Sequence, residues 1–172
     1  MSATTGSQAP NTTFTYIPWA PELDSGKVCG VPQTFKAHDR WKGKKVVVVA
    51  IPGAFTPVCH QNHIPGFVEK INELKAKGVD EVVVIAVNDA FVMSGWGVTV
   101  GGKDQIVYAC DNDLAFSKAL GGTLDLTSGG MGVRTARYAV VLDDLKITYF
   151  GMDEGNMGAP EKSSVDAVLA QL

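Results

Sequence analysis

Short apolar runs alternate along the chain with segments of helical spacing. The run at residues 45–51 contains four consecutive valines and predicts a strand that is buried on both faces, as in the centre of a parallel or mixed sheet. Similar but shorter patterns predict the other strands. These are residues 14–17, expected as an edge strand before Pro18, residues 81–87 and 106–110, and residues 137–142 and 146–150, which flank Asp143-Asp144-Leu145 as an antiparallel hairpin.

Helical spacing is clearest in residues 59–77, where four apolar side chains fall on one face. Pro65 is expected to bend this helix one turn beyond Cys59, and Gly78 to end it. Three shorter helices are predicted: residues 89–96 with Asn88 or Asp89 as cap, residues 114–120 ended by Gly121-Gly122, and a last helix through Leu169 with Ser163 and Ser164 as caps.

Three segments carry weaker patterns. We expect residues 1–11 to be a loose tail, residues 22–41 to be a loop with at most one short element, and residues 124–134, which are rich in glycine, to be irregular. The 172 residues fit one domain, residues 1–172. Strands separated by helices predict an α/β domain with a central mixed sheet flanked by helices, and the closing hairpin and helix are typical of a thioredoxin-like fold.

Composition and charge narrow the function classes. The net charge of −3 and the lack of a basic cluster argue against nucleic-acid binding, and no apolar stretch reaches the ~20 residues needed to span a membrane. The start of the chain does not resemble a secretory signal. Three cysteines without a close pair indicate a reducing compartment, so we expect a cytoplasmic protein. Ala170-Gln171-Leu172 matches a peroxisomal import signal poorly, which leaves that compartment possible.

Candidate chemistry lies between the four valines and the long helix. Residues 52–59 read PGAFTPVC, so Cys59 is placed where a strand passes into a helix. Helix N-termini present unpaired N–H groups and partial positive charge, which favour a thiolate. The backbone N–H groups there can also stabilise charge on a leaving oxygen. Cys59 is therefore interpreted as a nucleophile or redox centre.

Two side chains are candidates to assist Cys59. The hydroxyl of Thr56 can reach the sulfur, although Thr56 could instead be a turn residue bonded to the backbone. Arg137, at the start of the hairpin strand, is the candidate cation, whereas Arg134 should lie on the opposite face of an extended chain. Cys59 and His63 have the i, i+4 spacing of a ligand pair, but His60 and His38 do not complete a set, so no metal is expected.

The pattern Pro52, Thr56, Cys59 resembles the active-site signature of peroxiredoxins. The form PGAFTPVC is similar to the peroxiredoxin-five branch, which includes fungal alkyl hydroperoxide reductases and fungal peroxiredoxin allergens. The similarity extends through residues 63–66, 78–80, 88–93 and 137–141 and covers nearly the whole chain from residue 14. It implies a thioredoxin-like fold and a thiol-dependent peroxidase that acts on hydrogen peroxide and alkyl hydroperoxides without a cofactor.

The resemblance also implies a role for each residue of the signature. Cys59 would attack the peroxide and become a sulfenic acid, Thr56 would position thiolate and peroxide, Pro52 would shield the site from water, and Arg137 would polarise the peroxide. Cys29, in the stretch Cys29-Gly30-Val31-Pro32, would resolve the sulfenic acid as a disulfide with the Cys59 of a partner subunit in a homodimer, and a thioredoxin would reduce that disulfide. Cys110 ends an apolar strand and is expected in the core.

Other readings of the residues predict different chemistry. A thioredoxin-type reductase would need two cysteines two residues apart, and residues 57–60 supply one. A cysteine hydrolase would need a histidine base oriented by an acid, which the spacing does not favour. The remaining alternative is a redox or chaperone module on the thioredoxin fold without peroxidase activity.

Overall fold

The computed structural model describes residues 5–154 and 158–172. Seven strands form one mixed sheet in the order β2-β1-β5-β4-β3-β8-β9, and two more form a separate small sheet, β6-β7. The strands are β1 (Thr13–Tyr16), β2 (Gln33–Lys36), β3 (Lys45–Ala50), β4 (Glu81–Ala86), β5 (Ile106–Asp111), β6 (Thr123–Leu126), β7 (Gly132–Thr135), β8 (Tyr138–Asp143) and β9 (Lys146–Met152). Strands β3, β4 and β5 are parallel, and the remaining pairs are antiparallel.

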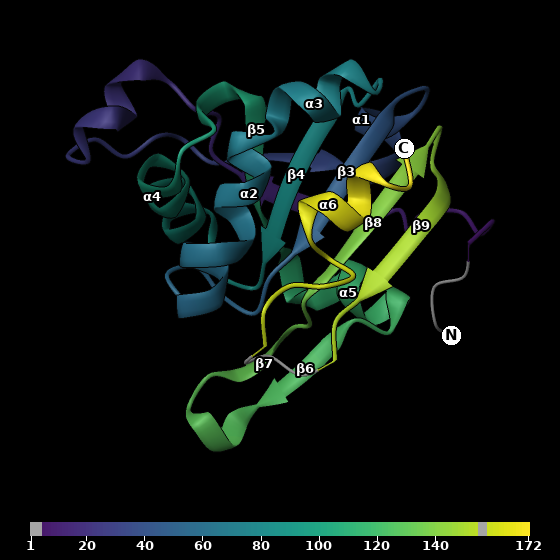
Figure 1. Cartoon of the computed structure of the whole chain (residues 1–172). Coiled ribbons are helices and arrows are strands. Elements are labelled where there is room, and N and C mark those ends of the chain that lie inside the picture. The colour runs from purple at the N-terminus through teal and green to yellow at the C-terminus, as the bar shows by residue number, and fades with distance from the viewer. Residues whose placement is uncertain (1–4, 155–157) are drawn as a thin grey trace.

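Helices cover both faces of the large sheet (Figure 1). Four of them share one face with the odd-numbered valines of β3, and two lie on the other face with the even-numbered valines. The first group is α2 (Ile64–Glu69), α3 (Ile71–Ala76), α4 (Ala90–Val100) and α6 (Val165–Leu169), and the second is α1 (Ala37–Trp41) and α5 (Ala115–Leu120). The thioredoxin-like fold with a central mixed sheet is confirmed.

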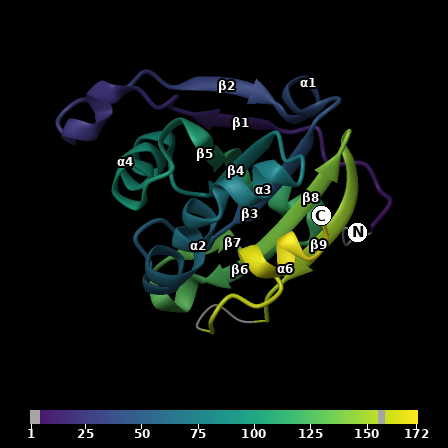
Figure 2. The ribbon, with the colours of Figure 1, turned by 45° about the horizontal axis from the view of Figure 1, so that its top comes forward.

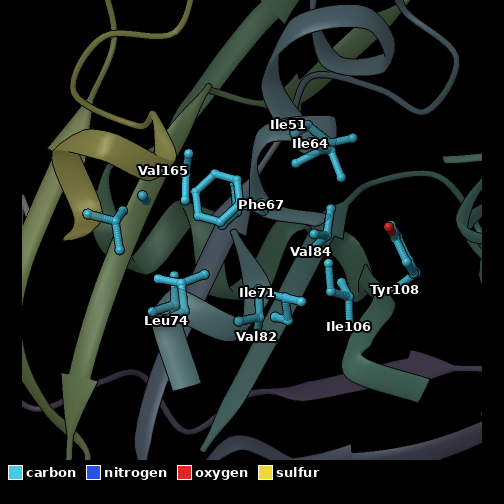
Figure 3. Packing of buried hydrophobic residues seen from close by; sticks show 14 of the residues in the cluster. Ile51, Ile64, Phe67, Ile71, Leu74, Val82, Val84, Ile106, Tyr108 and Val165 are labelled. Carbon is cyan, nitrogen blue, oxygen red and sulfur yellow. The ribbon is translucent and has the colours of Figure 1, made fainter. Parts of the chain in front are cut away.

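The larger core cluster lies between the sheet and α2, α3, α4 and α6. Figure 3 shows Phe67 and Leu74 projecting from the helices toward Val82 and Val84 of β4. Phe67, Leu74 and Val84 are fully buried. Burial of such side chains stabilises the fold by roughly 1.5–3 kcal/mol each. It also fixes the helix that follows Cys59 against the carboxyl end of the central strands.

The edge near the N-terminus differs from the sequence prediction. Strand β1 is not an edge strand, because β2 pairs with it and forms the border of the sheet (Figure 2). Residues 22–41 therefore hold more than one short element: the 3-10 turn η1 (Pro21–Ser25), β2 and α1. The expected loose tail also needs correction, since Gln8 bridges to Lys146 and Ala9 is buried, whereas residues 1–4 lie outside the described residues.

The glycine-rich segment is more regular than expected. Strands β6 and β7 pair as an antiparallel hairpin around a 3-10 turn, η5 (Thr127–Gly129), and project from the end of the molecule at which β3 leads into the helix (Figure 1). Gly130 and Gly132 have positive φ values, which glycine adopts without strain. The hairpin leads directly into residues 136–137 and so controls how β8 begins. No helix in the described part of the chain is long and apolar enough to cross a membrane.

Candidate active site

The helix that carries Cys59 begins with an irregular turn. Helical structure starts at Pro57, and residues Cys59–His63 form a π turn, η2, before α2. The N–H of Ile64 bonds to the carbonyl of Cys59, five residues earlier. Pro65 has no N–H to continue the α-helical pattern, and the wider turn accommodates that loss. The expected distortion near Pro65 is thus present, and a second break at Lys70 separates α2 from α3.

Cys59 and Arg137 meet in the interior of the protein. The sulfur of Cys59 is fully buried, and Arg137, just before β8, is 2% exposed. Nη1 of Arg137 donates a hydrogen bond to Sγ of Cys59 over 3.3 Å. A guanidinium keeps its charge under all physiological conditions, and a nearby positive charge favours the ionised form of a thiol. The fold therefore places the sulfur of Cys59 beside a fixed cationic side chain.

The loop before the helix is held by its own turn and by two neighbouring segments. The hydroxyl of Thr56 donates to the carbonyl of Gly53 over 2.7 Å, in place of the expected contact with the sulfur. A hydroxyl has one proton, so only its lone pairs remain for a substrate in this conformation. Pro52 is buried, and its carbonyl accepts a hydrogen bond of 3.4 Å from Nη1 of Arg134.

Two of these supports were not found from the sequence. The side chain of Asn88, directly after β4, accepts the N–H of Ala54 over 3.0 Å. Arg134 is the weaker candidate in the sequence, since an extended chain would put it on the opposite face, yet it reaches the loop because the chain turns between β7 and β8. Asn88 directly follows the buried strand β4, and the carboxyl end of β4 lies beside that of β3. This position after a buried strand is the sequence signal that could have identified Asn88.

His60 joins the first helical turn to α4. Its backbone N–H bonds to the carbonyl of Thr56 over 2.9 Å, and its Nδ1 accepts the indole N–H of Trp96 over 2.9 Å. The ring of Phe55 stacks on the ring of His60 with centroids 6.0 Å apart. Because an indole N–H can only donate, Nδ1 of His60 is the acceptor in this hydrogen bond.

His63 ties the same helix to the C-terminal segment. Its Nε2 lies 2.9 Å from the carbonyl oxygen of Ser163, and the Ser163 hydroxyl donates to the carboxylate of Asp153 over 2.5 Å. Burial lowers the pKa of His63 to about 4, against the hydrogen bond to Ser163, and the positive charge of Arg137 acts in the same direction as burial. Among the described residues, Nδ1 of His63 has no hydrogen-bond partner. His63 is thus a neutral ring near the guanidinium.

The other two cysteines differ from Cys59 in their surroundings. Cys29 is exposed on the loop after η1 and lines a surface pocket with Phe55 and Phe91. Cys110 in β5 is half-buried, and burial together with nearby carboxylates raises the pKa of its thiol to about 11. All three cysteines are free thiols. In the part of the chain that the structure describes, no three His, Cys, Asp or Glu side chains are grouped as a metal site requires.

Comparison with known proteins shows which family the chain resembles. The family model described as Redoxin matches residues 4–169. A putative peroxiredoxin from Malassezia furfur is 58% identical over 167 residues, which are 97% of this chain and 94% of that protein. The chain belongs to the peroxiredoxin family. This peroxiredoxin is accordingly a thiol-dependent peroxidase, an oxidoreductase that acts on peroxide, and it resembles the fungal members.

Two further relatives cover the length of this peroxiredoxin. Peroxiredoxin Pen c 3 from Penicillium citrinum is 44% identical over an alignment of 174 positions, which covers 100% of both chains. The structure of reduced Prx3 from Vibrio vulnificus in complex with hydrogen peroxide superposes with a TM-score of 0.83 and 34% identity, covering 98% of this chain and 94% of that one. The similarity therefore covers the fold along nearly the whole chain.

Proposed function

We propose that Cys59 is the peroxidatic cysteine and that Arg137 is its cationic partner. The observation that carries this proposal is the 3.3 Å hydrogen bond from the guanidinium to the sulfur inside the protein. The thiolate attacks one peroxide oxygen, the S–O bond forms as the O–O bond breaks, and the leaving alkoxide or hydroxide takes a proton to become alcohol or water. Cys59 is left as a sulfenic acid.

The surrounding residues supply positioning and exclusion of water. Arg137 holds the thiolate and can donate a further N–H to the peroxide, since a guanidinium has five N–H groups. The turn from Gly53 to Thr56 fixes the hydroxyl of Thr56, whose lone pairs can accept the proton of a hydroperoxide. Pro52 is buried at the end of β3 and limits access of water from that side. Hydrogen peroxide and alkyl hydroperoxides are the proposed substrates.

Cys29 is the proposed resolving cysteine. Its thiol attacks the sulfenic sulfur, a disulfide forms and water leaves, and a thioredoxin dithiol then reduces the disulfide. Support comes from its exposure and from the pocket that it shares with Phe55, whose ring stacks on His60 next to Cys59. A homodimer in which this bond joins two subunits is proposed on the exposed rings of Phe55 and Phe91 beside Cys29.

Two measurements test these steps. With thioredoxin, its reductase and NADPH, the wild type should oxidise NADPH when peroxide is added, and Cys59→Ser should give no activity. On a non-reducing gel, peroxide should convert the wild type to a covalent dimer, whereas Cys29→Ser should stay monomeric and still lose one thiol. A dimer that survives in Cys29→Ser but disappears in Cys110→Ser would refute the choice of resolving cysteine.

Cytoplasmic residence is proposed from the cysteine usage, with the peroxisome as the alternative compartment. The C-terminal residues Ala170-Gln171-Leu172 depart from the import signal at the middle position. A fluorescent protein fused to the N-terminus should stay diffuse with the wild-type chain and become punctate with Gln171→Lys. Punctate fluorescence of the wild type that coincides with a peroxisomal marker would favour the alternative.

A further inference from the structure

A side-chain hydrogen bond joins the first turn of the Cys59 helix to α4. Trp96 is fully buried in α4, and its indole N–H reaches Nδ1 of His60 over 2.9 Å. The Trp96 ring also packs edge-on against Tyr108 of β5, with centroids 5.7 Å apart. The donor therefore sits on a rigid support, and the acceptor sits on the turn that contains the reactive sulfur.

His60 also contacts the loop that precedes Cys59. Phe55 stacks on its ring, and the carbonyl of Thr56 accepts its backbone N–H. Phe55 has a positive φ of 60° although it is not glycine, a backbone conformation that costs free energy and needs support from its surroundings. Loop, helical turn and α4 thus meet at one imidazole ring.

We propose that the Trp96–His60 hydrogen bond is a latch that controls the opening of the Cys59 turn, with both residues as positioning residues. Cys59 has no exposed surface and Cys29 is exposed, so a bond between them requires the Cys59 turn to open. Peroxide, by contrast, is small and reacts with the closed form. The latch therefore acts differently on the two steps. It leaves the reaction of Cys59 with peroxide unchanged, and it limits the attack of a second thiol on Cys59, because a thiol is too large to reach the sulfur in the closed form.

The two ends of the latch are not equivalent. Removing the acceptor leaves the buried indole N–H without a partner, whereas removing the donor leaves a half-buried imidazole that can turn to water. His60→Ala should therefore open the turn more than Trp96→Phe does. His60→Asn should restore closure, because the amide oxygen of asparagine can take the place of Nδ1 as acceptor.

The test uses the full chain in a Cys29→Ser, Cys110→Ser background, where Cys59 is the one remaining thiol. A bulky maleimide should label Cys59 about fivefold faster in Trp96→Phe, which corresponds to ~1 kcal/mol, the net contribution of a typical hydrogen bond. His60→Ala should label faster still, and His60→Asn at close to the background rate. The second-order rate with hydrogen peroxide should stay within twofold in all of them.

Trp41→Phe is the matched control. Trp41 is also fully buried and also donates its indole N–H, over 3.0 Å, but to Glu81 and on the opposite face of the sheet. It should label at the background rate. Equal acceleration in Trp41→Phe and Trp96→Phe, or no difference between His60→Asn and His60→Ala, would overturn the latch.

The effect of the latch on disulfide formation with Cys29 rests on the proposed function and is measured in a separate experiment. With Cys29 restored, Trp96→Phe should form the disulfide faster after a pulse of peroxide. It should also accumulate less sulfinic acid on Cys59, measured by mass spectrometry. If labelling is accelerated but no disulfide forms in any variant, the latch stands and Cys29 is not the resolving thiol.

Discussion

Arg137 and Cys59 are 78 residues apart in the sequence, and Nη1 of the one donates to Sγ of the other over 3.3 Å. Arg137 lies just before β8, and Cys59 lies in the first helical turn after β3. These two strands are direct neighbours in the sheet. Their antiparallel pairing brings the start of β8 to the end of β3. The contact is thus a consequence of strand order, and it defines the electrostatics of the site.

Arg137→Gln should slow the reaction of Cys59 with peroxide by roughly 10²–10³-fold, the range found when one preorganised donor is removed from an active site. Lysine keeps the charge but has a single ammonium group in place of the planar fork, so Arg137→Lys should recover only part of the rate. Competition against a second peroxidase measures the rate constant directly.

Arg134→Gln is the comparison for that series. Arg134 contacts the carbonyl of Pro52 and not the sulfur, so its replacement should cost less than about tenfold. Circular dichroism should show that all three variants remain folded. Equal losses in Arg134→Gln and Arg137→Gln would contradict the assignment of the cationic partner.

Substitutions of Thr56 test the role of its hydroxyl in the turn before the helix. Thr56→Val removes the hydroxyl that donates to Gly53 and should lower the peroxide rate by about tenfold, because one hydrogen bond of ~1 kcal/mol and a substrate acceptor are both lost. Thr56→Ser keeps the hydroxyl and should stay near the wild-type rate. A serine variant as slow as the valine variant would show that the methyl group, and not the hydroxyl, is required.

Local sequence pattern was sufficient for the buried part of the fold. The valine run of β3 and the single apolar face of residues 64–74 predict the burial that the structure shows. Of the two cap candidates at each helix, Asp89 and Ser164 are the ones that accept backbone N–H groups. Strand β2 was missed because three of its four side chains are exposed and leave no apolar run. The β6-β7 hairpin was missed because its glycines and polar residues are typical of loops.

The candidate site was predictable where a residue type and its position in the motif carry the chemistry. Cys59 and Arg137 were named as candidates in this way, and the structure brings their side chains into contact. The contacts of His60 with Trp96, and of His63 with Ser163 and Asp153, join segments that only the tertiary fold brings together. No spacing along the chain encodes them. The hydroxyl of Thr56 was assigned to the sulfur because a sequence cannot distinguish it from the nearer carbonyl of Gly53.

Two glycines of α4 should respond in opposite ways to the same substitution. A Cβ on Gly97 would lie 2.5 Å from the ring of Tyr108, whereas a Cβ on Gly95 would meet nothing within 4 Å. Gly97→Ala should therefore lower the free energy of unfolding by about 1–3 kcal/mol through overpacking, and Gly95→Ala should raise it by about 0.5–1 kcal/mol through helix propensity. Urea denaturation measures both, and two changes of the same sign would show that α4 does not pack on Tyr108 as described.

His63 should make the stability of the protein depend on pH in a defined window. Its pKa is about 4 in the folded state against the ordinary value of 6.5, because the ring is buried and lies near Arg137. Above pH 6.5 the ring is neutral in both states. Between 6.5 and 4 the unfolded chain binds a proton that the folded protein does not, so the folded state loses stability as the pH falls, by about 2 kcal/mol at pH 5. Below pH 4 this loss stops growing.

His63→Gln isolates that contribution, since glutamine can still donate an N–H to the carbonyl of Ser163 but does not titrate. Urea unfolding at pH 7 and pH 5 should show a drop in stability that is about 2 kcal/mol smaller in His63→Gln than in the wild type. His38→Gln is the control, because His38 also bonds through Nε2 to a backbone carbonyl, that of Ala9, but is less buried. It should keep the full dependence on pH. If His63→Gln and His38→Gln lose stability equally, the buried ring near Arg137 is not the source of the acid sensitivity.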